Sequence, residues 1–344
     1  MESLATKYRP KTFSDLVEQD SVKTILLNQL ESGEIKNAYL FAGPAGDGKT
    51  TTARIFANEV NKGQGSPIEL DAASNNGVDD VRAIIQESKT KSLESEYKIF
   101  ILDEVHSFSN NAWQAMLKLL EEPPAKAIFI LCTTNPEKIP KTILSRVQRY
   151  DFQRISQQGI ADRLEYIIDE EFENTPEDEV WNYSKDSLEY IAKIADGGMR
   201  DAITMLDKCL AFSKELTIEN VVTALGVADY DLMNNLTRAL LDKQSEEVTK
   251  IVNSIYSTGK DLKVFAKTYT DFVLDLCKYG VTKSYEYIQI PQTVKLEELY
   301  KANDYYYFTV LLKHLVRLND IIKWDTTPKS TVEAMLLLEC FREN

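Results

Sequence analysis

The pattern of apolar and polar positions divides the chain into two parts. Up to about residue 152, short segments of strand character are centred on 39–42, 68–70, 98–102, 127–132 and 149–152. Segments with helical periodicity lie between them, at 15–33, 51–60, 78–89 and 109–122. Continuous apolar runs are typical of strands that are buried on both faces of a parallel sheet, with helices covering it. The pattern therefore predicts an α/β fold for this part.

Beyond residue 155 the strand signal is expected to stop. Helical segments are predicted at 160–171 and 187–195, and residues 227–344 have helical character throughout. One apolar stripe there consists of Leu262, Phe265, Tyr269, Phe272 and Leu276, and a second consists of Leu311, Leu315, Leu318 and Ile322. This part is predicted to be a helical bundle that packs or oligomerises.

A glycine-rich loop follows the first expected strand. Residues 43–50 read Gly-Pro-Ala-Gly-Asp-Gly-Lys-Thr, the phosphate-binding pattern of a glycine, four residues, and then Gly-Lys-Thr. In the order strand, loop, helix, the loop N–H groups and the helix N-terminus attract phosphate. Lys49 is expected to reach the terminal phosphates, and the Thr50 hydroxyl is expected to hold Mg²⁺. The alternative is a chance glycine turn, which a second motif disfavours.

That second motif is a pair of carboxylates after the strand at 98–102. Asp103 and Glu104 follow its apolar residues directly, and the carboxyl edge of an open parallel sheet is where ligands bind. Asp103 is expected to join the Mg²⁺ shell, and Glu104 is expected to polarise the attacking water. The polar residues 133–135, after the next apolar segment, are candidates for sensing the γ-phosphate.

Composition limits the possible partners and compartment. The chain has 344 residues with 40 Lys and Arg, 54 Asp and Glu, and a net charge of −14. This charge argues against nucleic acid coating the whole surface, but it is compatible with a local DNA contact. The four cysteines are far apart and show no metal spacing. Because no segment approaches the roughly 20 apolar residues of a membrane span, and the first residues lack a signal core, we expect a cytoplasmic protein without membrane contact.

Taken together, the motifs resemble those of the γ/τ-type ATPase subunits of the bacterial clamp loader, the AAA+ machine of the DNA polymerase III holoenzyme. The resemblance covers nearly the whole chain. It rests on the phosphate loop and on Lys7-Tyr8-Arg9-Pro10, Asp71-Ala72-Ala73-Ser74, Asp103-Glu104-Val105-His106, Leu120-Glu121-Glu122-Pro123-Pro124, Thr133-Thr134, Ser145-Arg146 and Gly198-Met199-Arg200-Asp201-Ala202.

This resemblance implies three domains. They are a RecA-like AAA+ α/β ATPase domain with a parallel sheet over 1–155, a small helical lid over 156–226, and an all-α collar over 227–344 that closes a pentamer. ATP is expected to bind between the first domain and the lid. The pentamer, of identical or different loader subunits, is expected to open a sliding clamp and place it on primer–template DNA.

The resemblance also implies roles for single residues. Arg146 is expected to complete a neighbouring subunit's ATP site as an arginine finger, and Arg200 is expected to be the lid's sensor arginine. The expected nucleotide-binding residues are Tyr8, Arg9, Pro10, Val17, Gly43, Ala45, Gly46, Asp47, Gly48, Lys49, Thr50, Thr51 and Arg200. The expected catalytic residues are Glu104, Lys49, Arg146, Arg200 and Thr134, and the expected Mg²⁺ ligands are Thr50 and Asp103.

The chain departs from the family pattern at several positions. Segment 58–67 has no cysteine where the family usually carries a four-cysteine zinc module, so we expect no zinc and a compact form whose origin, host or phage, stays open. Residues 75–77 replace basic residues near DNA, and Val147 replaces the finger motif's cysteine. Asp47 in the loop and Glu18 near the adenine are both candidates for lowering nucleotide affinity. A long τ-type tail is expected to be missing.

Three functions compete at this point. The leading one is an ATP-hydrolysing motor subunit. The second is a structural subunit that binds nucleotide without turnover, and the third is another AAA+ DNA remodeller such as a branch-migration motor. The complete set of loop, carboxylate and finger residues favours the first, and the collar-like C-terminus disfavours the third. Phe108 and Trp113 either belong to the core or press into a pocket of the clamp.

Overall fold

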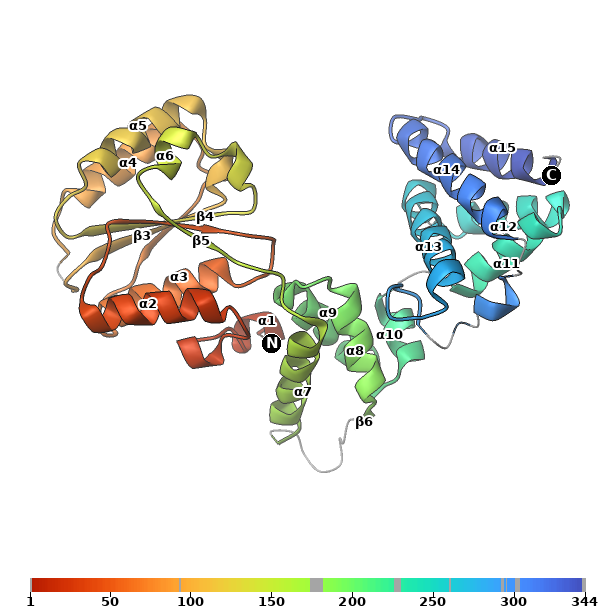
Figure 1. Cartoon of the computed structure of the whole chain (residues 1–344), viewed down its shortest axis with the longest axis horizontal. Helices are drawn as coiled ribbons and strands as arrows, with labels where there is room; N and C mark the ends of the chain where they lie inside the picture. The colour runs from red at the N-terminus through yellow and green to blue at the C-terminus, as the bar shows by residue number, and fades with distance from the viewer. Residues whose placement is uncertain are drawn as a thin grey trace. The chain divides into compact units, whose positions relative to one another are not determined.

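The computed structural model describes residues 2–92, 94–173, 182–225, 230–259, 261–291, 294, 296–300 and 304–341. The chain forms two compact units, Met1–Leu216 and Thr217–Asn344. The first unit contains the sheet and the sequence motifs, and the second is helical (Figure 1).

A five-stranded parallel sheet forms the centre of the first unit. Its strands are β1 (Ala38–Ala42), β2 (Ile68–Asp71), β3 (Lys98–Asp103), β4 (Ala127–Thr133) and β5 (Gln148–Asp151). Their order across the sheet is β2-β3-β4-β1-β5, and every neighbouring pair is parallel. Every residue of β1 and β4 is buried, as expected for strands that are covered on both faces.

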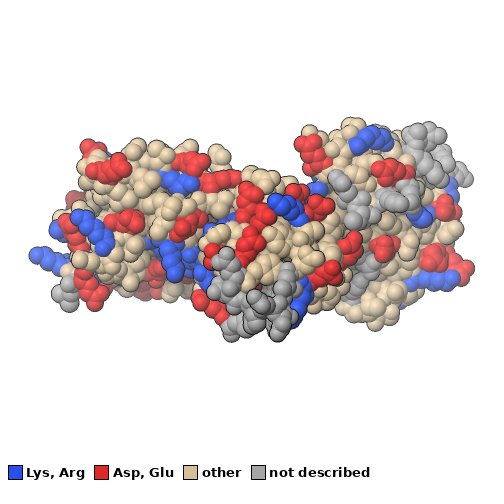
Figure 2. Space-filling model, turned by 90° about the horizontal axis from the view of Figure 1, so that it is seen from below, with Lys and Arg blue, Asp and Glu red and all other residues tan. Residues whose placement is uncertain are grey.

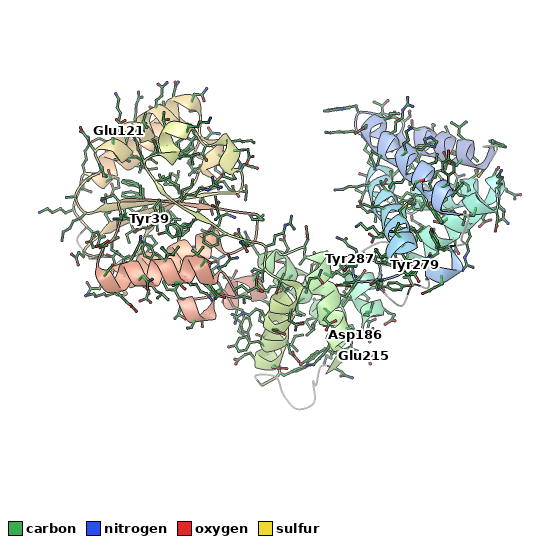
Figure 3. All side chains as sticks on the ribbon, in the orientation of Figure 1. Tyr39, Glu121, Asp186, Glu215, Tyr279 and Tyr287 are labelled. Atoms are coloured by element: carbon green, nitrogen blue, oxygen red, sulfur yellow. The ribbon has the colours of Figure 1, made fainter. Side chains whose placement is uncertain are left out.

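Helices cover both faces of this sheet (Figure 1). On one face lie α2 (Asp20–Ser32) and α3 (Lys49–Val60), and on the other lie α4 (Val78–Ser88), α5 (Asn110–Glu121) and α6 (Lys141–Leu144). Leu40 packs with the α4–α5 layer, whereas Tyr39 and Phe41 pack with the α2–α3 layer, because successive side chains of a strand point to opposite faces. Figure 3 shows Tyr39 at the sheet, where its ring meets Phe56 of α3 edge-on at 5.1 Å. The predicted α/β class is confirmed.

Short helices and a lid-like helical group complete the first unit. The short elements are α1 (Leu4–Lys7), η1 (Phe13–Asp15), η2 (Val105–Ser107) and η3 (Pro136–Lys138), and the longer helices are α7 (Gln157–Glu173), α8 (Lys185–Ile194) and α9 (Met199–Phe212). Two sequence predictions are wrong here. Strands do not stop at residue 155, because β6 (Asn182–Tyr183) pairs with β7 (Glu215–Leu216). The helix predicted from residue 15 begins at Asp20, because Glu18 and Gln19 have left-handed backbones.

The second unit is helical over its described residues. Its elements are α10 (Ile218–Leu225), α11 (Tyr230–Leu241), α12 (Ser245–Ser257), α13 (Leu262–Thr282), η5 (Leu296–Glu298), α14 (Asp304–Ile322) and α15 (Pro328–Phe341). Both predicted apolar stripes are buried in one core. At the edge of that core Tyr279, labelled in Figure 3, donates a hydrogen bond to Glu297 at 2.6 Å. No helix among the described residues is long and apolar enough to cross a membrane.

The surface carries charges of both signs. Figure 2 shows Lys and Arg interspersed with Asp and Glu on the face in view. The chain as a whole has 54 acidic against 40 basic residues. Phe108 and Trp113 are buried, with 6% and 5% of their surface exposed, and their rings meet edge-on at 5.3 Å. Both therefore belong to the core, and the alternative of a clamp contact by these side chains is not supported.

Candidate nucleotide site

The phosphate loop connects β1 to α3 at the carboxyl edge of the sheet. Gly46 and Gly48 have φ values of +78° and +99°, conformations that glycine adopts at little cost. Gly46 also lies against the start of α9, since an added Cβ there would come within 3.0 Å of the Gly198 Cα. Its carbonyl accepts a hydrogen bond from the Met199 N–H at 3.0 Å. The loop is thus closed on one side by the helix that carries Arg200.

A pocket of about 420 Å³ lies over this loop, within the first unit. It collects nearly all the residues that the sequence predicted for nucleotide and metal binding. Those that line it are Tyr8, Arg9, Pro10, Val17, Ala45, Gly46, Asp47, Gly48, Lys49, Thr50, Thr51, Asp103, Glu104, Thr134 and Arg200. Gly43 stands behind the lining and contributes its carbonyl to Lys49. Arg146 lies elsewhere.

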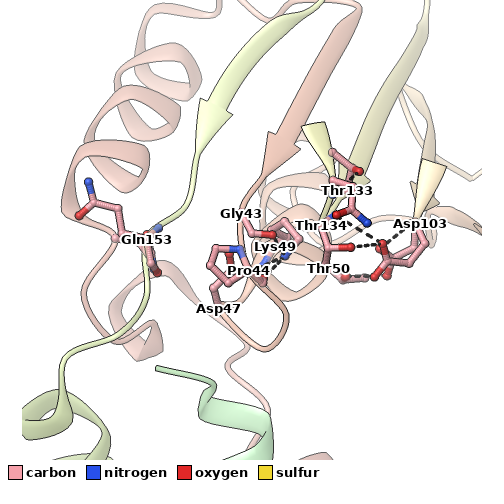
Figure 4. Close-up of polar contacts among 12 residues, drawn as sticks. Gly43, Pro44, Asp47, Lys49, Thr50, Asp103, Thr133, Thr134 and Gln153 are labelled. Carbon is pink, nitrogen blue, oxygen red and sulfur yellow. Dashed lines mark hydrogen bonds and ion pairs between the residues drawn. The ribbon is translucent and has the colours of Figure 1, made fainter. Parts of the chain in front are cut away.

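Lys49 is held entirely by its own loop (Figure 4). Its ammonium donates to Asp47 Oδ1 at 2.9 Å, to the Gly43 carbonyl at 2.9 Å and to the Pro44 carbonyl. Asp47 and Lys49 are 2% and 5% exposed. Burial raises the pKa of the Asp47 carboxyl, and the Lys49 ammonium opposes that rise. The ammonium that the motif assigns to phosphate is therefore paired with Asp47 in this structure.

Thr50 and Asp103 meet as the motif spacing predicts. The Thr50 hydroxyl donates to Asp103 Oδ2 at 2.7 Å (Figure 4). A hydroxyl and a carboxylate are hard oxygen donors, which suit Mg²⁺. These two residues, from α3 and the end of β3, therefore fit a magnesium ion that is also bound by phosphate.

Glu104 is positioned by the end of β4. Its Oε2 accepts a hydrogen bond from the Thr134 hydroxyl at 3.0 Å, and the Thr134 N–H lies at 3.4 Å. His106 Nδ1 lies 3.2 Å from the same Oε2 and 3.2 Å from the hydroxyl of Thr133. His106 is not among the predicted site residues, because a single histidine is more often a packed or capping residue than a catalyst. The structure identifies it as a neighbour of the Glu104 carboxylate.

The lid side of the pocket adds a second residue that the motifs did not indicate. Arg163 of α7 lines the pocket, as Arg200 does, and donates to the Tyr8 carbonyl at 3.1 Å. The Tyr8 hydroxyl donates to Glu171 at 2.6 Å, and burial together with the Glu171 carboxylate raises the pKa of Tyr8. Glu18, by contrast, does not line the pocket, and its carboxylate accepts a hydrogen bond from the Ser156 N–H.

Arg146 makes its contacts within its own chain. Its guanidinium donates to Glu121 Oε1 at 2.7 Å and to the Thr142 carbonyl at 2.7 Å. Figure 3 shows Glu121 at α5, in the helix layer above the sheet. The predicted finger residue therefore lies apart from the pocket of its own subunit, and a role in catalysis requires a second chain.

Two family models match segments of the first unit. A family model described as "DNA polymerase III, delta subunit" matches residues 66–156, and one described as "DNA polymerase III clamp loader subunit, ATPase lid domain" matches residues 159–215. A solved structure of the RuvB Holliday junction branch migration motor of Thermotoga maritima has 19% identity and a TM-score of 0.51, and the match covers 74% of this chain and 86% of that one. At this identity the likeness shows the fold alone, which is the predicted AAA+ fold.

Curated relatives are more similar in sequence. DNA polymerase III subunit tau of Bacillus subtilis is 36% identical over 98% of this chain and 63% of its own length. Subunit gamma of Buchnera aphidicola (subsp. Acyrthosiphon pisum) is 34% identical over 74% of this chain and 75% of its own. The chain spans 63% or less of the tau relatives' length. The chain belongs to the γ/τ family of clamp-loader subunits of DNA polymerase III.

Proposed function

We propose that the chain is an ATP-hydrolysing subunit of a clamp loader, active in a pentameric ring with identical or different loader subunits. Using ATP and Mg²⁺, the ring opens a sliding clamp and loads it onto primer–template DNA. One observation carries the proposal. The loop lysine, the Thr50–Asp103 pair and the Thr134–Glu104 pair all lie in one pocket, at the carboxyl edge of the sheet.

In this proposal each of these residues has a task. Lys49 neutralises the charge of the terminal phosphates, and the loop N–H groups and the α3 N-terminus bind their oxygens. Thr50 and Asp103 would hold Mg²⁺, which would supply positive charge to the β- and γ-phosphates. Glu104 orients water for attack, and Thr134 fixes the carboxylate. Arg200 and Arg163, from the lid helices α9 and α7, line the same pocket and would bind the nucleotide from the lid side.

A second candidate is a subunit that binds nucleotide without turnover. The Asp47–Lys49 ion pair favours it, because this pair engages the lysine that catalysis needs. The presence of Lys49, Thr50, Asp103 and Glu104 together in the pocket favours the first candidate. An ATPase assay with and without a clamp and primed DNA distinguishes the two, since only a motor subunit shows turnover that both ligands stimulate.

Lys49→Ala tests the assignment of the loop. We expect nucleotide-dependent clamp loading and ATP turnover to be lost. No other residue of loop 43–50 has a positively charged side chain that could neutralise the β- and γ-phosphates. Lys62→Ala, which removes an exposed lysine just beyond α3, is the matched control and should retain activity. Wild-type turnover by Lys49→Ala would refute the assignment.

A further inference from the structure

The ammonium group of Lys49 has no proton left for a ligand. An ammonium carries three N–H donors, and all three acceptors come from the loop: Asp47 Oδ1, the Gly43 carbonyl and the Pro44 carbonyl. A phosphate oxygen can therefore bind Lys49 only if one of these contacts breaks. The two carbonyls belong to the backbone of the loop, so the Asp47 side chain is the partner that can leave by rotation.

The Asp47 carboxylate also uses the anion-binding end of α3. Its Oδ1 accepts from the Lys49 backbone N–H at 3.3 Å, in the first turn of the helix. The N-terminus of a helix attracts anions through its free N–H groups and its dipole. Asp47 thus resembles a bound phosphate oxygen in its charge, in its contact with the ammonium and in its contact with the helix end.

The second oxygen of the Asp47 carboxylate lacks a hydrogen-bond partner. Asp47 Oδ2 is buried without a hydrogen-bond partner, and an unpaired buried polar atom is costly. It fits only because residue 43 is glycine, since a Cβ at Gly43 would lie 2.3 Å from Oδ2. The Asp47 carboxylate is therefore held mainly by its contacts with Lys49.

We propose that Asp47 is a built-in competitor for the phosphate position on Lys49, and that it sets the nucleotide affinity of the site. The proposal rests on the proposed function, because it concerns the same nucleotide pocket. Binding of a nucleoside diphosphate or triphosphate requires the carboxylate to leave the ammonium, since two anions compete for one cation. The free chain therefore binds nucleotide more weakly than the same chain without this carboxylate.

Titration calorimetry with ADP and Mg²⁺ tests this. Asp47→Asn keeps the shape and removes the charge, and Asp47→Ser also removes the reach to Lys49. Both are expected to bind ADP at least tenfold more tightly than wild type, which corresponds to about 1.4 kcal/mol. Asp151→Asn is the matched control, because it removes one negative charge from the end of β5, and it should leave the affinity unchanged.

The possible outcomes are distinct. Equal or weaker ADP binding by both Asp47 variants would overturn the proposal while leaving the proposed function intact, provided that wild type binds. Loss of folding in both variants, seen as loss of cooperative thermal unfolding, would also overturn it, because Asp47 would then be a structural group. If no variant and no wild-type chain binds ADP or ATP, the proposed function itself fails.

Discussion

At the scale of single residues, Glu104 combines a left-handed backbone with a side chain that two neighbours contact. Its φ is +49°, a left-handed conformation that is uncommon for a residue with a side chain. One carboxylate oxygen, Oε2, accepts from the Thr134 hydroxyl and lies 3.2 Å from His106 Nδ1. Strained residues whose surroundings hold them in place are concentrated at active sites. This combination supports Glu104 as the group that orients water.

Glu104→Gln is expected to retain nucleotide binding and to slow turnover by roughly 10²-fold or more, the usual contribution of a general base. The amide keeps the shape and can accept from Thr134, but it does not take up a proton as a carboxylate does. Phosphate release and ADP calorimetry measure the two effects separately. Glu137→Gln, at an exposed glutamate in η3, is the control. Unchanged turnover in Glu104→Gln would show that another group acts as the base.

At the scale of elements, the connection from α3 to β2 is short, and hydrogen bonds hold its first residue to the segment before β3. Asn61, just after α3, donates to the Tyr97 carbonyl at 2.9 Å and accepts from the Tyr97 N–H at 2.9 Å. Lys62 and Gly63 then turn the chain with φ values of +52° and +77°. The backbone thus passes directly to β2, in the segment where the sequence lacks the four cysteines of the family's zinc module.

Metal analysis of the purified protein is therefore expected to find no stoichiometric zinc, because a structural zinc site needs four Cys or His ligands close together. Dialysis against a chelator should leave the unfolding temperature unchanged. Purification in zinc-supplemented buffer provides the control against simple depletion. One zinc ion bound per chain would contradict the interpretation of residues 58–67.

The sequence predicted these elements unevenly, for physical reasons. The strands β1, β3 and β4 were predictable because burial on both faces demands continuous apolar runs. The two-residue strands β6 and β7 were not, because they are too short to show a period. The loop motif fixed the place of Lys49, but its pairing with Asp47 depends on side-chain rotamers that spacing does not encode. Arg163 reaches the pocket through tertiary packing alone.

At the scale of the whole molecule, Arg146 can act as an arginine finger only in the ATP site of a second chain. Arg146 pairs with Glu121 in its own subunit and lies apart from the pocket that contains Lys49. That pair is partly exposed, and an exposed ion pair contributes little stability. The Arg146 side chain can therefore leave Glu121 for a neighbouring subunit's nucleotide at little loss of folding stability. An arginine finger raises the rate of hydrolysis by on the order of 10³-fold or more.

The central claim is that ATP sites are shared between subunits of a ring, and a mixing experiment tests it most directly. Arg146→Ala chains lack the finger, and Lys49→Ala chains lack the loop charge, so each is expected to be inactive alone. In mixed rings, some interfaces pair a normal loop with a normal finger. ATP hydrolysis stimulated by clamp and primed DNA is then predicted to return, while Arg146→Ala alone still binds nucleotide. If mixed rings form and remain as inactive as either parent, the shared-site account is contradicted.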